Sequence, residues 1–137
     1  MGWIRFSLAV LALAGCNNVN AVDQGEKVLE TQVGYATYYA QSFQGKETAS
    51  GLKFDNRSAL AAHPSYPFGT VARVTNLENG KRVSVVIVDR GPYGRNRREG
   101  AIIDLSHAAA TQLGMIQDGQ VKVRLDTLIW GDGKRRD

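Results

Sequence analysis

Apolar and polar residues alternate along most of the chain from residue 33 onward, and this alternation predicts short β-strands. The alternating segments are rich in β-branched and aromatic residues and are bounded by glycine and proline. Strands are expected at residues 33–39, 59–62, 70–77, 82–88 and 120–128. The pair Asn79-Gly80 separates two of them and is typical of a tight hairpin. Five or six short strands in so short a chain favour a small barrel.

One helix is expected among the strands, between Asp104 and Leu113. Apolar side chains there recur at the three- and four-residue spacing of a helix. Asp104 or Ser106 is placed to cap its first turn, and Gly114 is placed to end it. This pattern favours a capping role for Asp104. The predicted fold class is mainly β with one short helix.

The first sixteen residues have the pattern of a lipoprotein signal peptide. Arg5 precedes an apolar run at residues 6–14 that is too short to cross a bilayer as a helix. The run leads into a segment at residues 13–16 that is typical of a bacterial lipobox and ends at Cys16. Lipidation is therefore expected at Cys16 and would anchor the protein to a membrane. The alternative is that Cys16 is a small residue of an ordinary signal peptide.

The rest of the chain divides into a polar tether at residues 17–31, a folded domain at 32–130 and a charged tail at 131–137 that is expected to fray. A net charge of +4 suits an anionic partner, but the basic residues are scattered and no nucleic-acid-binding motif is found. Two distant histidines and one cysteine make no cluster of metal ligands. No metal, no cofactor, no nucleic acid and no internal disulfide are expected.

Asp89 is the first residue to suspect of chemistry. It follows the run Val85–Val88 directly and leads into a Gly-Pro turn. A carboxylate at the end of a buried strand costs several kcal/mol unless something compensates it. Such a residue is a candidate for a functional site.

Several short motifs, taken in order and spacing, resemble the rare lipoprotein A (RlpA) family of bacterial lytic transglycosylases. They lie at residues 34–39, 48–51, 54–55, 59–63, 77–80, 89–92 and 103–106. The resemblance implies a six-stranded double-psi β-barrel. It also implies a lipoprotein of the bacterial cell envelope, on the outer membrane facing the periplasm in a Gram-negative cell. Such a protein cleaves peptidoglycan glycan strands, prefers strands without stem peptides, and has division-site proteins as possible partners.

The resemblance also implies roles for individual residues. A lytic transglycosylase protonates the glycosidic oxygen and then deprotonates the muramic C6 hydroxyl, so one carboxyl with a raised pKa can act as acid and then as base. Asp89 is expected to fill this role. His63 is the second catalytic candidate, by bonding Asp89 or by orienting the sugar. Asp55, Tyr39 and Arg90 are expected to bind the substrate.

Each of these residues has a structural alternative. Asp89 could pair with a nearby arginine or cap a loop. His63 precedes Pro64 and could be a structural residue, while Asp55 could close a turn on its own backbone. Tyrosines in strands are usually packing residues, so Tyr39 could belong to the core.

One position departs from the family pattern and opens a second functional hypothesis. The family has a glutamate three residues before the aspartate of the Phe54-Asp55 motif, and this chain has Leu52 there. A leucine cannot transfer a proton. Either Asp89 carries the whole acid–base task, or the domain is a non-catalytic, expansin-like binder of glycan.

Overall fold

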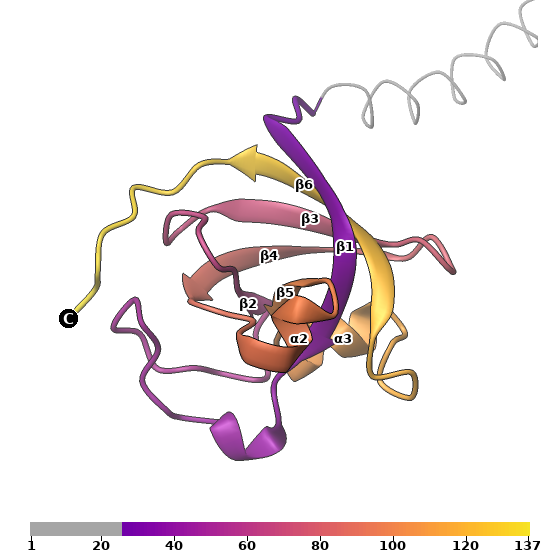
Figure 1. The fold of residues 1–137 in the computed structure, drawn as a ribbon. Helices are drawn as coiled ribbons and strands as arrows, with labels where there is room; N and C mark the ends of the chain where they lie inside the picture. Colours follow the sequence, from indigo (N-terminus) through magenta and orange to yellow (C-terminus); the bar gives the residue numbers. More distant parts are fainter. Residues whose placement is uncertain (1–25) are drawn as a thin grey trace, which may run out of the picture.

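Alternating apolar side chains form six strands that close into a barrel in the computed structural model, which describes residues 26–137 (Figure 1). Cys16 and the signal peptide lie outside the described residues. The strands are β1 (Glu30–Tyr38), β2 (Leu60–Ala62), β3 (Val71–Asn76), β4 (Arg82–Asp89), β5 (Ala101–Leu105) and β6 (Val121–Ile129). The helices are η1 (Gln41–Phe43), α2 (Gly94–Arg98) and α3 (His107–Gln112). The expectation of a mainly β barrel is confirmed.

The strands follow the order β1-β5-β2-β4-β3-β6 around the barrel. β1 pairs in parallel with β5, and β2 pairs in parallel with β4, while the other neighbours are antiparallel. The short strand β2 therefore lies between β4 and β5. This arrangement brings the C-terminal end of β4 and the C-terminal half of β5 to opposite sides of the same three residues.

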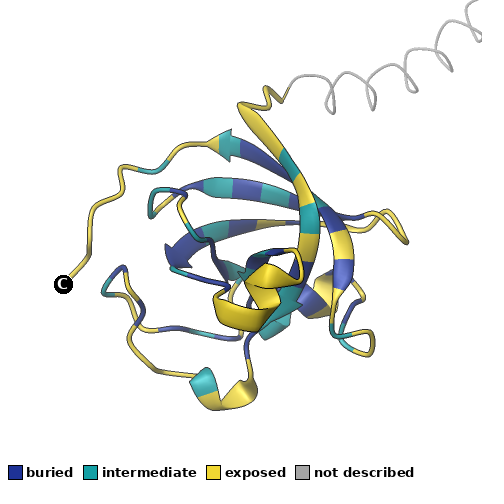
Figure 2. Ribbon diagram, in the orientation of Figure 1, coloured by how far each residue is buried: buried dark blue, intermediate teal, exposed yellow. Residues whose placement is uncertain are grey.

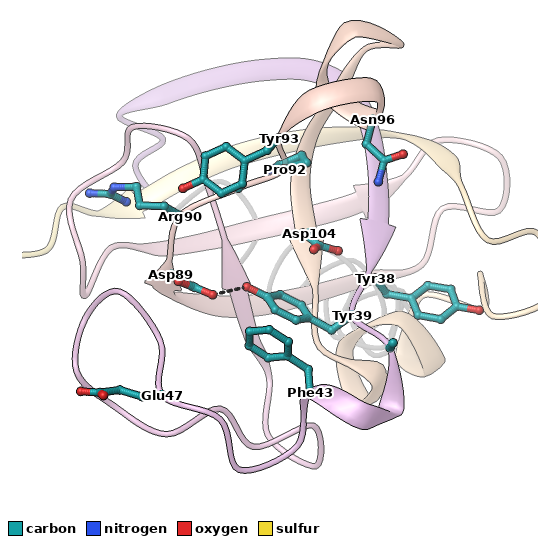
Figure 3. Close-up of a pocket in the computed structure, with 12 residues that line it drawn as sticks. Tyr38, Tyr39, Phe43, Glu47, Asp89, Arg90, Pro92, Tyr93, Asn96 and Asp104 are labelled. Carbon is teal, nitrogen blue, oxygen red and sulfur yellow. Dashed lines mark hydrogen bonds between the residues drawn. The ribbon is translucent and has the colours of Figure 1, made fainter.

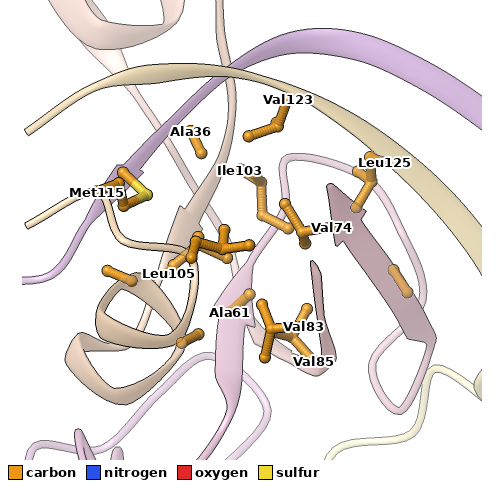
Figure 4. Close-up of a cluster of buried hydrophobic side chains, with 14 of the residues drawn as sticks. Ala36, Ala61, Val74, Val83, Val85, Ile103, Leu105, Met115, Val123 and Leu125 are labelled. Atoms are coloured by element: carbon orange, nitrogen blue, oxygen red, sulfur yellow. The ribbon is translucent and has the colours of Figure 1, made fainter. Parts of the chain in front are cut away.

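Inward-facing side chains from all six strands fill the barrel (Figure 4). Buried positions alternate with half-buried ones along β5 and with exposed ones along the first half of β4, as the pleat of a strand requires (Figure 2). Helix α3 adds Ala109 and Ala110, and the turn after it adds Leu113 and Met115. The core is thus continuous from the strands to this helix.

A second apolar cluster lies outside the barrel and holds the loop between η1 and β2 against it. Phe54 of this loop stacks on Tyr39, with ring centroids 4.1 Å apart, and Phe43 packs on both rings. Ala62 and Val88 form the barrel side of the cluster. The loop therefore has an anchored position next to the end of β4.

The expected hairpin is confirmed, but the expected helix is partly wrong. β3 and β4 pair antiparallel on either side of Asn79-Gly80. The segment that was expected to open the helix is strand β5, and a second helix, α2, lies in the basic loop before it. Ile102 and Ile103 are β-branched and favour the strand. Ser106, not Asp104, caps α3 by accepting a hydrogen bond from the Ala109 amide.

Both ends of the folded part extend further than the sequence predicts. β1 begins at Glu30, two residues inside the expected tether, and Leu29 already donates its amide to the Thr127 carbonyl. The charged tail was expected to fray, but it runs along the barrel and hydrogen-bonds to it (Figure 1). Within residues 26–137, no helix is long and apolar enough to cross a membrane.

We expect Ser106→Ala to destabilise the fold by about 2 kcal/mol. The fully buried Ser106 hydroxyl donates to the Ser58 carbonyl and accepts from the Leu60 and Ala109 amides, so its loss removes three hydrogen bonds and takes the cap from the buried Ala109 amide. The measurement is the free energy of urea unfolding. Ser84→Ala makes the same change at an exposed position of β4 and is the matched control. Equal stability of the two variants would contradict the assigned role.

Candidate active site

Two aspartates face each other across β2. In the strand register, Ala62 pairs with Asp89 of β4 on one side and with Asp104 of β5 on the other. Adjacent strands lie roughly 4.8 Å apart, so the Cα atoms of the two aspartates are about 10 Å apart. The Ala62 side chain itself is fully buried and packs in the second apolar cluster. The same row continues into β1, where Thr37 pairs with Asp104.

A shift in register brings Asp89 into this row. Ala61 pairs with Ile87, but the next residue, Ala62, pairs with Asp89 and skips Val88. Strict alternation would place Asp89 on the same face as Ile87, which points into the barrel. Irregularities of this kind re-aim side chains at functional sites. The shift thus moves a carboxylate from the core side to the pocket side.

The two carboxylates line one pocket of about 460 Å³ on the outside of the barrel (Figure 3). Its wall combines aromatic rings with a few polar groups. The lining residues are Tyr38, Tyr39, Ala40, Phe43, Glu47, Asp89, Arg90, Gly91, Pro92, Tyr93, Asn96 and Asp104. Tyr93 is 64% exposed, so its ring is open to a bound molecule. The turn after β4 and helix α2 form one side of the pocket, and η1 with its loop forms the other.

Asp89 is held by two hydrogen-bond donors. The Tyr39 hydroxyl donates to Asp89 Oδ2 over 2.6 Å (Figure 3), and the Ala49 amide donates to Oδ1 over 2.8 Å. Burial of the phenol and its hydrogen bond to Asp89 raise the pKa of Tyr39 well above its ordinary value. Tyr39 therefore remains a proton donor at any working pH. Tyr39 lines the pocket and bonds Asp89, and its role in binding the substrate stays a prediction.

Asp104 is the residue that sequence reasoning missed. Burial, together with the negative charge of Asp89, raises the pKa of Asp104 from its ordinary 3.8 to about 6, although the Thr37 hydroxyl donates to it over 3.2 Å. A carboxyl with a pKa of about 6 keeps its proton in about half of the molecules at pH 6 and in about a tenth of them at pH 7. The signal in the sequence was the β-branched pair Ile102-Ile103, which favours a strand at Asp104 and not a helix cap.

His63 lies beside this pocket rather than in it. Its Nδ1 accepts hydrogen bonds from the Ser65 and Tyr66 amides, and its Nε2 lies 3.0 Å from the Gln32 side-chain oxygen. Burial, with the charges of Arg90 and Arg97, lowers the pKa of His63 to about 4. Among the described residues, the ring makes these bonds and none to the Asp89 carboxylate. Its link to Asp89 is through the backbone, where the His63 amide donates to the Asp89 carbonyl over 3.1 Å.

Arg90 lines the pocket, but its guanidinium points to the backbone of the neighbouring loop. It donates to the Tyr66 carbonyl over 2.7 Å and to the His63 carbonyl over 3.3 Å, and it lies 4.1 Å from the centre of the Phe68 ring. Arg90 therefore fixes the loop that carries His63. Arg90 is thus a lining residue whose guanidinium is already hydrogen-bonded to the protein.

The structure does not bring Asp55 to the two aspartates. Its carboxylate accepts from the Arg57 amide and guanidinium and from the Ser58 hydroxyl, which closes a turn. Those hydrogen bonds hold the pKa of Asp55 below its ordinary value. The alternative interpretation of Asp55 as a turn residue is the one that the contacts support.

Leu52 also lies away from the two aspartates. It lines a separate hollow of about 210 Å³ beside Phe68 and Arg136. Glu47 is the carboxylate that this loop brings to the edge of the main pocket. Residues 26–137 contain no group of three or more histidine, cysteine, aspartate or glutamate side chains placed to hold a metal ion.

The fold and the paired carboxylates define a class of protein. It is a closed double-psi β-barrel with two aspartates in one pocket, on the strands at either side of β2. A family model described as lytic transglycolase matches residues 31–125. The chain therefore belongs to this family, the RlpA family, as its motifs predict.

Curated relatives agree over the same region. A protein of Aquifex aeolicus is 48% identical over 98 residues, and one of Treponema pallidum is 53% identical over 92 residues. Both are named "Probable endolytic peptidoglycan transglycosylase RlpA". The matches cover 72% and 67% of this chain but only 42% and 28% of the relatives. The chain thus spans less than half the length of these relatives.

Solved structures share the fold. The Streptomyces papain inhibitor matches with a TM-score of 0.59 and 24% identity, over 76% of this chain and 99% of its own. An expansin of Clavibacter michiganensis matches with a TM-score of 0.56 and 25% identity, over 73% of this chain and 51% of its own. The same barrel therefore occurs in proteins with different names.

We expect Asp104→Asn to stabilise the protein at pH 7, on the order of 2 kcal/mol. Because the folded pKa of Asp104 is raised to about 6, the folded state binds more protons than the unfolded state between pH 4 and 6. Stability is therefore lost as pH rises through this range, and asparagine, which does not titrate, avoids the loss.

Urea unfolding at pH 3.5 and at pH 7 measures the effect. The gain should appear at pH 7 and be small at pH 3.5. Asp118→Asn makes the same change in an exposed loop and should give no gain at either pH. A variant that is less stable than the wild type at pH 7 would contradict the pKa assigned to Asp104.

Proposed function

We propose that this protein is an endolytic lytic transglycosylase and that the pocket between β4 and β5 cleaves peptidoglycan glycan strands. The observation that carries the proposal is the pair of carboxyl groups on either side of Ala62. One of them, Asp104, has its pKa raised to about 6, which suits a general acid near neutral pH. The names of the relatives support the choice of substrate.

The reaction needs one proton given and one proton taken. Asp104 donates its proton to the glycosidic oxygen between N-acetylmuramic acid and N-acetylglucosamine, and that C–O bond breaks. The muramic C6 hydroxyl attacks the anomeric carbon, and Asp89 accepts the hydroxyl proton. The products are an anhydro-muramic end and a free N-acetylglucosamine end, so no water is consumed. This division of labour differs from the expectation of Asp89 acting alone.

Other residues of the pocket bind and orient. The Tyr39 hydroxyl and the Ala49 amide fix the direction of the Asp89 carboxylate. The exposed ring of Tyr93, with Phe43 on the opposite wall, offers apolar surface against which a sugar can stack. His63 acts as a positioning residue, since its neutral ring ties the loop after β2 to Gln32. Arg90 supports the same loop from the other side.

Three finer parts of the proposal rest on the sequence. The preferred substrate is a strand without stem peptides. The protein is anchored through a lipid on Cys16 to a membrane of the bacterial envelope, the outer membrane facing the periplasm in a Gram-negative cell. Division-site proteins are its candidate partners. Labelling with a fatty-acid analogue tests the anchor, and locating the protein in dividing cells tests the association with the division site.

The second candidate is a glycan-binding domain without catalysis. Its support is the expansin fold match and the replacement of the family glutamate by Leu52. Leu52 does not line the pocket that holds the two aspartates, so the pocket keeps both of its carboxyl groups. This observation favours the enzyme.

We expect the purified protein to release anhydro-muramic ends from glycan strands, and Asp89→Asn and Asp104→Asn each to lower the rate at least about a hundredfold. Mass spectrometry distinguishes the anhydro product, which is one water lighter than a hydrolysis product. Asp118→Asn is the control and should retain the wild-type rate.

The outcomes separate the hypotheses. A wild-type protein that sediments with peptidoglycan and yields no anhydro ends is a binder, and the proposed activity is then wrong. Full activity of Asp104→Asn would leave the activity in place but remove Asp104 as the acid.

A further inference from the structure

The segment after β6, residues 131–136, is seated on the barrel and ends beside the active-site loop (Figure 1). We call it the C-terminal strap. The Gly131 amide donates to the Thr70 hydroxyl over 3.1 Å, and the Gly133 amide donates to the Phe68 carbonyl over 3.0 Å. A Cβ on Gly131 would lie 2.1 Å from the Phe68 carbonyl oxygen. Only glycine permits this close contact, so the strap packs against the barrel at a defined position.

The far end of the strap pairs with the loop that supports Asp89. The Arg136 amide donates to the Ser50 carbonyl, and the Ser50 amide donates to the Val88 carbonyl at the end of β4. Gly51 has a φ of +93°, and a Cβ there would lie 1.7 Å from the Arg136 carbonyl oxygen. Ser50 is therefore held between β4 on one side and the strap on the other.

Arg135 makes the side-chain contacts of this end. Its Nη1 donates to the Ala49 carbonyl over 3.0 Å, and its Nη2 donates to the Glu47 carboxylate over 2.8 Å. The Ala49 amide is the group that donates to Asp89 Oδ1. One residue, Ala49, thus connects the Arg135 guanidinium to the Asp89 carboxylate through its own backbone.

The contact with Arg135 also fixes Glu47 at the edge of the pocket. Figure 3 shows Glu47 pointing outward from the loop, away from Asp89. The pocket already holds two carboxyl groups, and a third negative charge near them would oppose the ionisation of both. The ion pair with Arg135 compensates this charge.

We infer that Arg135 is a positioning residue, which holds the Ala49 amide on Asp89 and pairs with Glu47 at the edge of the pocket. The effect on the reaction rate rests on the proposed function, but the effect on the Ala49 amide does not. Small displacements of a supporting group cost a catalytic site up to about a hundredfold in rate. The strap is thereby a part of the active site that the barrel strands do not supply.

The test compares Arg135→Ala with Arg136→Ala in the full chain. Both remove a half-exposed arginine side chain from the strap, but the Arg136 guanidinium pairs with Asp132 inside the strap. Two readouts are taken: hydrogen exchange of the Ala49 amide by NMR, and the kcat and KM of glycan cleavage. The Ile87 amide, which bonds the Thr70 carbonyl in the core, is the internal reference for global stability.

We expect Arg135→Ala to speed Ala49 exchange and lower kcat, each about tenfold, with KM within twofold of wild type and Ile87 exchange unchanged. Arg136→Ala should match the wild type in all four. Unchanged Ala49 exchange in Arg135→Ala would overturn the inference, as would an equal effect of both variants. If the wild type cleaves no glycan, the proposed function fails, and the exchange comparison still decides the inference about Arg135.

Discussion

The short strand β2 sets the geometry on which the site depends. Strand β4 pairs with it in parallel and β5 pairs with it antiparallel, so two carboxylates from distant parts of the chain meet across a single alanine. The distance between them follows from the spacing of hydrogen-bonded strands and not from flexible side chains. Because one residue of register moves every side chain to the opposite face, the skip of Val88 is as necessary as the aspartates themselves.

The two carboxyl groups of the pocket have different surroundings. Hydrogen-bond donors hold Asp89 in place, whereas burial and a like charge disfavour the ionised form of Asp104. Asp89 receives a phenol and a backbone amide, and the phenol is held by the Phe43 and Phe54 rings. Asp104 receives one long hydrogen bond from Thr37 and faces a like charge. Two carboxyl groups with different surroundings are the usual means by which one site supplies both an acid and a base.

Local signals predicted most of the fold, while the site required tertiary information. The alternation around Val74 and Val123 and the Asn79-Gly80 turn were enough for the strands and the hairpin. Asp104 was misassigned because β5 ends only two residues before α3 begins. An aspartate just before a helical pattern is typical of a helix cap, and the sequence alone did not distinguish it from the last polar residue of a strand. His63 and Asp55 belong to family motifs, but their bonds to Gln32 and Arg57 depend on loops that no periodicity describes.

The central claim is that Asp89 and Asp104 share one pocket and that burial and the charge of Asp89 raise the pKa of Asp104. Carbon-13 NMR of the aspartate carboxyl groups, followed from pH 2 to 8 in the wild type and in Asp89→Asn, tests this directly. The account predicts that the pKa of Asp104 is about 6 and moves down when Asp89 loses its charge. A pKa of Asp104 near its ordinary 3.8, unchanged in Asp89→Asn, would contradict the account.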